Sequence, residues 1–206
     1  MKYIVGIDEV GRGPLAGPVT VGIAVCELGL YKKLKKDRYL PPTGKDSKKL
    51  SPELRQQYAK YLKILSTRFH LVQKGNLEYI IIHVSNKVID EKGIAFCIRK
   101  AINQGIKKLN LNPKQCEVLL DGGLRAPSEF TKQRTIIKGD EKERIIAWAS
   151  ILAKVSRDAL MCKLAKKYPQ YGFESHKGYG TKQHCKAVSK CGLSSIHRKT
   201  FCKRFR

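Results

Sequence analysis

The sequence has few acidic residues, and this shortage limits the kinds of molecule that the protein can be expected to bind. Only 17 Asp and Glu oppose 42 Lys and Arg in 206 residues, which leaves a formal net charge of +25. Such an excess of positive charge is self-repulsive in a compact fold, and it suits a polyanionic partner. Nucleic acid is the first candidate partner, and an acidic membrane surface is the second.

Long apolar runs are also missing. No run reaches the roughly 18–20 residues of a membrane-spanning helix. Asp8 and Glu9 interrupt the N-terminal apolar run too early for the core of a signal peptide. The sequence therefore predicts a cytoplasmic protein that has no membrane partner. Hydrophobic residues still make up 42% of the chain, which is enough for a real core.

Closely spaced cysteine pairs are absent. The seven cysteines are odd in number and include no C-x-x-C pair, which excludes a disulfide framework and a zinc knuckle. We expect all seven to be reduced, with Cys97 and Cys162 buried in helices. His176, His184 and Cys185 lack the matching second pair that a zinc site needs, so we predict none there.

Apolar segments and turn residues alternate in a way that predicts an α/β sheet flanked by helices. Helices are expected from Ser51-Pro52-Glu53 onward, over 77–109 with a break near Gly93, and over 142–167. The segment around Lys32–Lys36 is expected to be a solvated basic loop, and the tail from 168 remains unassigned. Strands are expected at 2–7, 19–25, 69–73, 117–120 and 135–138.

Three aspartates follow separate strand-like segments, at Asp8, Asp121 and Asp140. Strand ends are where open α/β sheets place their sites, although each aspartate alone is ordinary turn chemistry. Converging carboxylates repel one another unless a cation neutralises them or a proton is retained. Oxygen ligands favour Mg²⁺ or Mn²⁺, and such a cluster in a basic protein indicates phosphodiester hydrolysis by a two-metal scheme.

The segment Gly6–Pro18, GIDEVGRGPLAGP, resembles the N-terminal signature of ribonuclease HII. Further blocks follow in that family's order: Asp46–Leu50, Leu119–Gly122, Lys138–Asp140, Ala149–Asp158, Tyr168–Phe173, His176–Tyr179 and Ile196–Arg198. Together they extend over nearly the whole chain. The sequence departs from the family pattern at Gly123, at Trp148 and, loosely, over 70–92.

The resemblance implies one RNase H-like domain over 1–206, with a mixed β-sheet flanked by helices and a basic, helical C-terminal appendage from about 168. It also implies a monomeric endonuclease that depends on Mg²⁺ or Mn²⁺. Its substrates would be RNA–DNA hybrids and duplex DNA with single embedded ribonucleotides. Cleavage on the 5′ side of the ribonucleotide would leave 3′-hydroxyl and 5′-phosphate ends.

Site residues follow from the same resemblance. The catalytic, metal-binding carboxylates would be Asp8, Glu9, Asp121 and Asp140. The ribonucleotide and its 2′-hydroxyl would contact Gly11, Arg12 and Gly13, where glycine permits close backbone approach. Tyr179 would pack on the adjoining deoxyribose and help to bind the 2′-hydroxyl. Phosphate contacts are expected from Lys48, Lys49, His176 and Lys177.

Two alternatives remain beside this interpretation. Ribonuclease HIII usually has an N-terminal extension and a Gly-Lys-Gly triplet, whereas here the acidic pair is at positions 8 and 9 and the triplet is Gly-Arg-Gly. A non-catalytic, basic nucleic-acid-binding protein would bind in a salt-dependent way without cutting.

We expect Asp158 to pair with Lys154 at i,i+4 rather than to bind metal. The aromatic residues Tyr168, Tyr171 and Phe173 should pack the tail onto the core.

Overall fold

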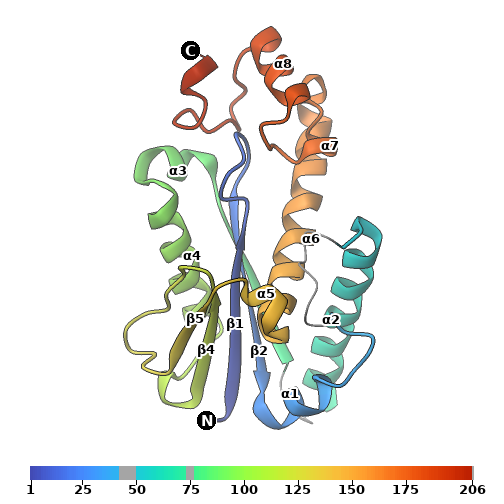
Figure 1. The fold of residues 1–206 in the computed structure, drawn as a ribbon, viewed down its shortest axis with the longest axis vertical. Helices are drawn as coiled ribbons and strands as arrows, with labels where there is room; N and C mark the ends of the chain where they lie inside the picture. The colour runs from blue at the N-terminus through green and yellow to red at the C-terminus, as the bar shows by residue number, and fades with distance from the viewer. Residues whose placement is uncertain (42–49, 73–76, 206) are drawn as a thin grey trace.

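A five-stranded mixed sheet runs through the structure, a computed structural model that describes residues 1–41, 50–72 and 77–205 (Figure 1). Its strand order is β3–β2–β1–β4–β5. The central strand β1 is antiparallel to β2 and parallel to β4, so the expected mixed sheet is confirmed. The strands are β1 (Tyr3–Val10), β2 (Val19–Glu27), β3 (Leu77–Val84), β4 (Cys116–Asp121) and β5 (Gln133–Ile136).

Helices cover both faces of this sheet (Figure 1). One face packs against α3 (Asn86–Lys92) and α4 (Ile94–Lys108). The other packs against α1 (Leu28–Leu34), α2 (Pro52–Val72) and the long α6 (Arg144–Lys167). The remaining elements are α5 (Gly139–Lys142), α7 (Phe173–His176), α8 (Lys182–Cys191) and the 3₁₀ turns Pro113–Gln115, Pro169–Tyr171 and Lys203–Phe205.

Two glycines in the strands let α6 approach the sheet closely. A Cβ at Gly6 would overlap the carbonyl oxygen of Ile145, and one at Gly22 would overlap that of Ala149. The helix backbone therefore lies directly on β1 and β2, with no side chain between them at these points. This contact brings Ser150 of α6 over Asp8 of β1.

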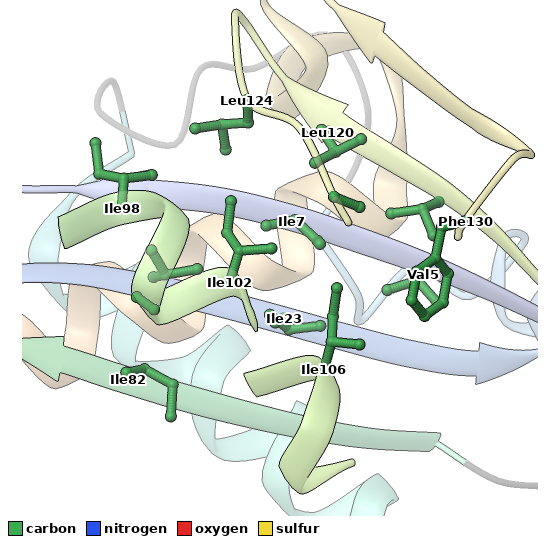
Figure 2. Packing of buried hydrophobic residues seen from close by; sticks show 14 of the residues in the cluster. Val5, Ile7, Ile23, Ile82, Ile98, Ile102, Ile106, Leu120, Leu124 and Phe130 are labelled. Carbon is green, nitrogen blue, oxygen red and sulfur yellow. The ribbon is translucent and has the colours of Figure 1, made fainter. Parts of the chain in front are cut away.

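The opposite face of the sheet is a conventional apolar core (Figure 2). Ile98, Ile102 and Ile106 recur every four residues along α4, so they share one face of the helix. They pack against strand residues such as Ile7 and Ile23, all of them buried.

The tail from Tyr168 forms a small core together with Ala16, Met161 and Ala165, above the carboxyl end of β1 (Figure 1). Tyr171 and Phe173 are buried in it, and Tyr168 packs against its edge, as the sequence predicted. The expected ion pair is also present, with Lys154 Nζ 2.9 Å from Asp158 Oδ1. The carboxylate of Asp158 is therefore paired with Lys154, which lies one turn earlier on α6.

Several predicted elements were wrong. Residues 77–84 form strand β3 rather than the start of a helix, because this β-branched run pairs along β2. Helix α2 continues through Val72, so residues 69–72 are helical where a strand was expected. Helix α1 occupies 28–34 and so includes Lys32 and Lys33, which were expected in a basic loop. The long helix expected over 142–167 is confirmed as α6, which begins two residues later, at Arg144, because Glu143 separates it from α5.

The cysteines and helices agree with the remaining expectations in part. All seven cysteines are free, as predicted. Cys97 is buried, but Cys162 is exposed on α6, which corrects the expectation for that residue. Within the described ranges, no helix combines the length and apolar character needed to cross a bilayer.

Candidate active site

Strand pairing brings Asp8 and Asp121 together. The parallel register between β1 and β4 pairs Ile7 with Leu120, so each aspartate is the next residue along its own strand. Parallel strands keep equivalent residues side by side. Two carboxylates that are 113 positions apart in sequence therefore lie at the same level of the sheet.

Helix α5 brings a third carboxylate to the same place. The backbone N–H of Gly139 donates to Asp121 Oδ1 at 2.6 Å, which ties the start of α5 to the end of β4. Asp140 is the next residue and is buried. The side chain of Asp121 therefore makes a structural hydrogen bond in addition to lying near other carboxylates.

The carboxylates affect one another electrostatically. Burial raises the pKa of Asp8 well above its usual value, and repulsion from Glu9, Asp121 and Asp140 raises it further. A hydrogen bond from Ser150 opposes this rise. Burial likewise raises the pKa of Glu9, against the ion pair that its Oε1 makes with Arg12 Nε at 3.0 Å. The four predicted carboxylates thus form one electrostatic group.

This group suits a hard divalent cation. The Oε2 atom of Glu9 is buried, and no hydrogen-bond partner reaches it among the described residues. All the donors are oxygens, which Mg²⁺ and Mn²⁺ prefer, and a cation would relieve both the repulsion and the unpaired oxygen. As the side chains stand, no group of three or more His, Cys, Asp or Glu residues in the described part of the chain is arranged to hold a metal ion.

An open pocket of about 580 Å³ lies beside Asp8 and Glu9. The segment Gly11–Gly13 and Tyr179 also line it, so the structure brings these predicted residues together. Asp121 and Asp140 are not part of its lining. Val10, Arg55, Ser150 and Lys154 complete the wall. A neighbouring pocket of about 510 Å³ shares Arg55 and Lys154 and includes Lys177.

The loop that follows β1 presents unused amide donors. The N–H groups of Arg12 and Gly13 donate to no acceptor in the described part of the chain. Gly11 has φ +88°, and a Cβ there would collide with Arg157, whereas one at Gly13 would meet nothing within 4 Å. Glycine is therefore required at position 11 by backbone geometry, and at position 13 it leaves space for a ligand.

Tyr179 faces this loop from the tail. Its side chain is 39% exposed, and the guanidinium of Arg157 lies 5.8 Å from the ring centroid. Arg157 is itself buried and donates to the carbonyl oxygens of Ala16, Pro18 and Lys177 at 3.0–3.3 Å. One arginine thus joins the loop after β1 to the turn that carries Tyr179.

The structure does not bring every predicted contact to the pocket. The ring of His176 is buried, and its Nε2 lies 2.8 Å from the carbonyl oxygen of Tyr171, so it faces the tail. Lys177 lines the neighbouring pocket only. Lys48 and Lys49 lie outside the described residues. The phosphate contacts from these two lysines remain predictions.

Sequence reasoning missed several residues of the site. Ser150, Lys154 and Arg157 fall inside the recognised block Ala149–Asp158, but which of them face the site depends on how α6 sits on the sheet. Arg198 falls inside the block Ile196–Arg198, to which no role was assigned. Arg55 had no such signal, because it belongs to α2 and reaches the pocket only through packing.

Comparisons with known proteins match the sequence to one family. The family model described as Ribonuclease HII matches residues 5–205. A Ribonuclease HII of Endomicrobium trichonymphae is 42% identical over 198 residues, covering 96% of this chain and 84% of the relative.

Solved structures show the same RNase H-like fold. The ribonuclease H2 of Pyrococcus horikoshii superimposes with a TM-score of 0.72 at 26% identity, covering 99% of both chains. The Bst-RNase HIII structure in complex with Mn²⁺ has a TM-score of 0.66 at 16% identity, covering 97% of this chain and 64% of that one. The sequence similarity thus lies with ribonuclease HII rather than with HIII.

Proposed function

Because the chain belongs to the ribonuclease HII family and is thus a ribonuclease H, we propose that it cuts on the 5′ side of ribonucleotides, both in RNA–DNA hybrids and singly in duplex DNA. One observation supports this most directly. Asp8 and Glu9, which form one electrostatic group with Asp121 and Asp140, line the same pocket as a glycine loop with two amides that donate to no described acceptor. Reacting groups and a means of recognising ribose are therefore adjacent.

Ribose recognition follows from the chemistry of the pocket wall. A 2′-hydroxyl can accept from the N–H groups of Arg12 and Gly13, and DNA offers no such oxygen. The exposed ring of Tyr179 provides a flat apolar surface for the adjoining deoxyribose. Arg55 and Lys154 place positive charge along the wall, where it would hold the phosphate backbone.

Asp8, Glu9, Asp121 and Asp140 would hold the divalent cations, Mg²⁺ or Mn²⁺. When bound, two such ions supply charge stabilisation and water activation for phosphodiester hydrolysis. Water would add to phosphorus and the P–O3′ bond would break, leaving a 3′-hydroxyl and a 5′-phosphate. Ser150 holds Asp8 in place, and Gly139 holds Asp121, so the ligand oxygens are oriented before the metal arrives. We also propose that the chain acts as a monomer in which the appendage from about 168 is part of one catalytic domain.

A cleavage assay tests this function. The substrates are duplex DNA with one embedded ribonucleotide, an RNA–DNA hybrid and an all-DNA duplex, each with Mg²⁺, with Mn²⁺ or with chelator. We expect one cut beside the ribonucleotide and cuts in the hybrid, all dependent on metal. Equal cutting of the all-DNA duplex would refute the specificity. Salt-sensitive binding without any cutting would favour the non-catalytic alternative.

A thermal shift experiment tests the metal site without using activity. A ligand at tenfold excess over its Kd stabilises the folded state by about 1.4 kcal/mol. For a chain of this size, we expect the melting temperature to rise by about 3–6 °C in Mn²⁺ or Mg²⁺. Asp121→Asn should abolish the rise, whereas Glu117→Gln, at the other end of β4, should keep it. An equal rise in both variants would place the metal elsewhere.

A further inference from the structure

The neighbouring residues His197 and Arg198 have no role in the function described so far. We propose that they are a pair of positioning residues that fix the two halves of the ribonucleotide-binding surface. Arg198 holds the loop Gly11–Gly13, and His197 holds the backbone at Tyr179 through His184. The inference rests on the proposed function, since it assigns these two residues to the recognition of the same substrate.

The Arg198 half rests on three hydrogen bonds to main-chain carbonyls. Its side chain is fully buried and donates to Gly11 O at 2.7 Å, Arg12 O at 2.9 Å and Gly17 O at 3.0 Å. In the part of the chain that the structure describes, no carboxylate forms a salt bridge with it. Burying a guanidinium that has no carboxylate partner costs free energy, and the hydrogen bonds from Arg198 to these carbonyls offset that cost.

These bonds determine where the free amides point. In a trans peptide, the C=O and N–H groups point in opposite directions. The carbonyl of Gly11 shares its peptide with the N–H of Arg12, and the carbonyl of Arg12 shares its peptide with the N–H of Gly13. Because Arg198 binds both carbonyls, both amides are directed away from it. These are the same two amides that donate to no acceptor among the described residues.

The His197 half is a chain of hydrogen bonds with one consistent set of tautomers. The N–H of Ser194 donates to His197 Nδ1 at 2.9 Å, so this ring carries its proton on Nε2. His197 Nε2 then donates to His184 Nε2 at 3.0 Å. His184 in turn carries its proton on Nδ1 and donates to the carbonyl oxygen of Tyr179 at 2.9 Å. The tautomers follow from the fixed direction of the first donor.

The protonation of the two rings is consistent with this chain. Burial lowers the pKa of His197 to about 4, and it also lowers the pKa of His184. Both rings are therefore neutral at pH 7. A neutral His184 ring has one acceptor and one donor, and this series of hydrogen bonds uses each of them once.

The backbone joins the two halves. The N–H of Arg198 donates to Leu15 O at 2.7 Å, and the N–H of Leu15 donates to Gly178 O at 2.8 Å. The loop after β1 therefore lies between the turn at Tyr179 and the segment at His197. Displacing either side chain of the pair should move one half of the surface relative to the other.

The His197 half is tested by a ratio of two activities. His197→Phe keeps an aromatic ring against Tyr171 and Phe173, which lie 4.9 and 5.7 Å away, but removes both nitrogens. A misplacement of about 1 Å can cost on the order of 10²-fold in rate. We expect cleavage at a single ribonucleotide to fall by about 10- to 100-fold. Cleavage inside a long hybrid should change far less, because no deoxyribose adjoins most of its ribonucleotides.

His197→Gln is the conservative variant. Its amide nitrogen can replace the Nε2 donor, so it should recover much of the lost rate at the single ribonucleotide. A role limited to folding would lower both activities in the same proportion and leave their ratio unchanged. That outcome, with no recovery in His197→Gln, would overturn the His197 half.

The Arg198 half is tested by a split between KM and kcat. Arg198→Lys keeps the charge but not the three-way fork. We expect KM to rise about tenfold on both substrates, because both present a 2′-hydroxyl to the loop. A smaller folded fraction would instead lower kcat and leave KM unchanged, which would overturn this half. Arg204→Met is the matched control, because this exposed tail arginine donates to Cys185 Sγ and, within the described ranges, to no carbonyl of the loop Gly11–Gly13.

The same assay separates the inference from the function beneath it. A wild-type protein that cuts neither substrate with metal would overturn the proposed function, and the inference with it. A wild-type protein that cuts at the ribonucleotide, beside His197→Phe and Arg198→Lys variants that behave like Arg204→Met, would overturn the inference alone.

Discussion

Asp121→Asn is expected to lower metal-dependent cleavage by about 10³-fold or more. Metal ions contribute several kcal/mol to charge stabilisation in the transition state, and each tenfold in rate corresponds to about 1.4 kcal/mol. The amide is a poor ligand for a hard cation, so the variant should lose most of this contribution. The measurement is the single-turnover rate on duplex DNA with one ribonucleotide. Glu117→Gln, on the same strand, should retain the wild-type rate.

The same substitution should not destabilise the metal-free protein. Asparagine keeps the Oδ1 acceptor for Gly139, and it removes a charge that raises the pKa of both Asp8 and Glu9. The melting temperature in chelator should therefore be unchanged or higher. Asp121→Ala loses the acceptor as well and should melt lower.

Two results would contradict this assignment. Cleavage retained in Asp121→Asn would remove Asp121 from the catalytic group. A drop of several degrees in the metal-free melting temperature of Asp121→Asn would instead make the carboxylate primarily structural, so its loss of activity would say nothing about metal binding. The two measurements together separate catalysis from folding.

Tyr179→Ala should strongly impair cleavage at an isolated ribonucleotide. The ring is 39% exposed, lines the pocket with Gly11–Gly13 and faces the Arg157 guanidinium, so its removal opens the wall on which the adjoining sugar would pack. We expect the cleavage rate to fall by about 10- to 100-fold, which is the size of effect that misplacing a substrate usually has. Because the side chain is partly exposed, the melting temperature should change little.

Tyr179→Phe separates the ring from its hydroxyl. If packing on the sugar is the larger contribution, Phe should retain most of the rate that Ala loses. If the hydroxyl binds the 2′-oxygen, Phe should resemble Ala. A wild-type rate in Tyr179→Ala on the single-ribonucleotide substrate would remove this residue from substrate recognition.

The errors in the predicted elements have a common physical cause. Residues 77–84 are apolar and β-branched, and such a short run fits either a strand or a buried helix until its partner is known. Pairing with β2 decides for the strand. Helix α2 likewise continues through Val72, where local composition suggested a strand, because propensity is a weak preference that helix continuation and packing override.

The sequence by itself identified the family, because the family's motifs consist of residue types in a fixed order along the chain. It also predicted the carboxylate set and a polyanionic partner from residue types and net charge. The proximity of Asp8 and Asp121 depends on the register between β1 and β4, which sequence alone does not specify. The roles of Arg157, His197 and Arg198 were decided only by the tertiary structure. The two arginines donate to main-chain carbonyls of distant segments, and a main-chain carbonyl looks the same at every position in a sequence. His197 bonds to the ring of His184, and only the folding of the tail brings these two rings together.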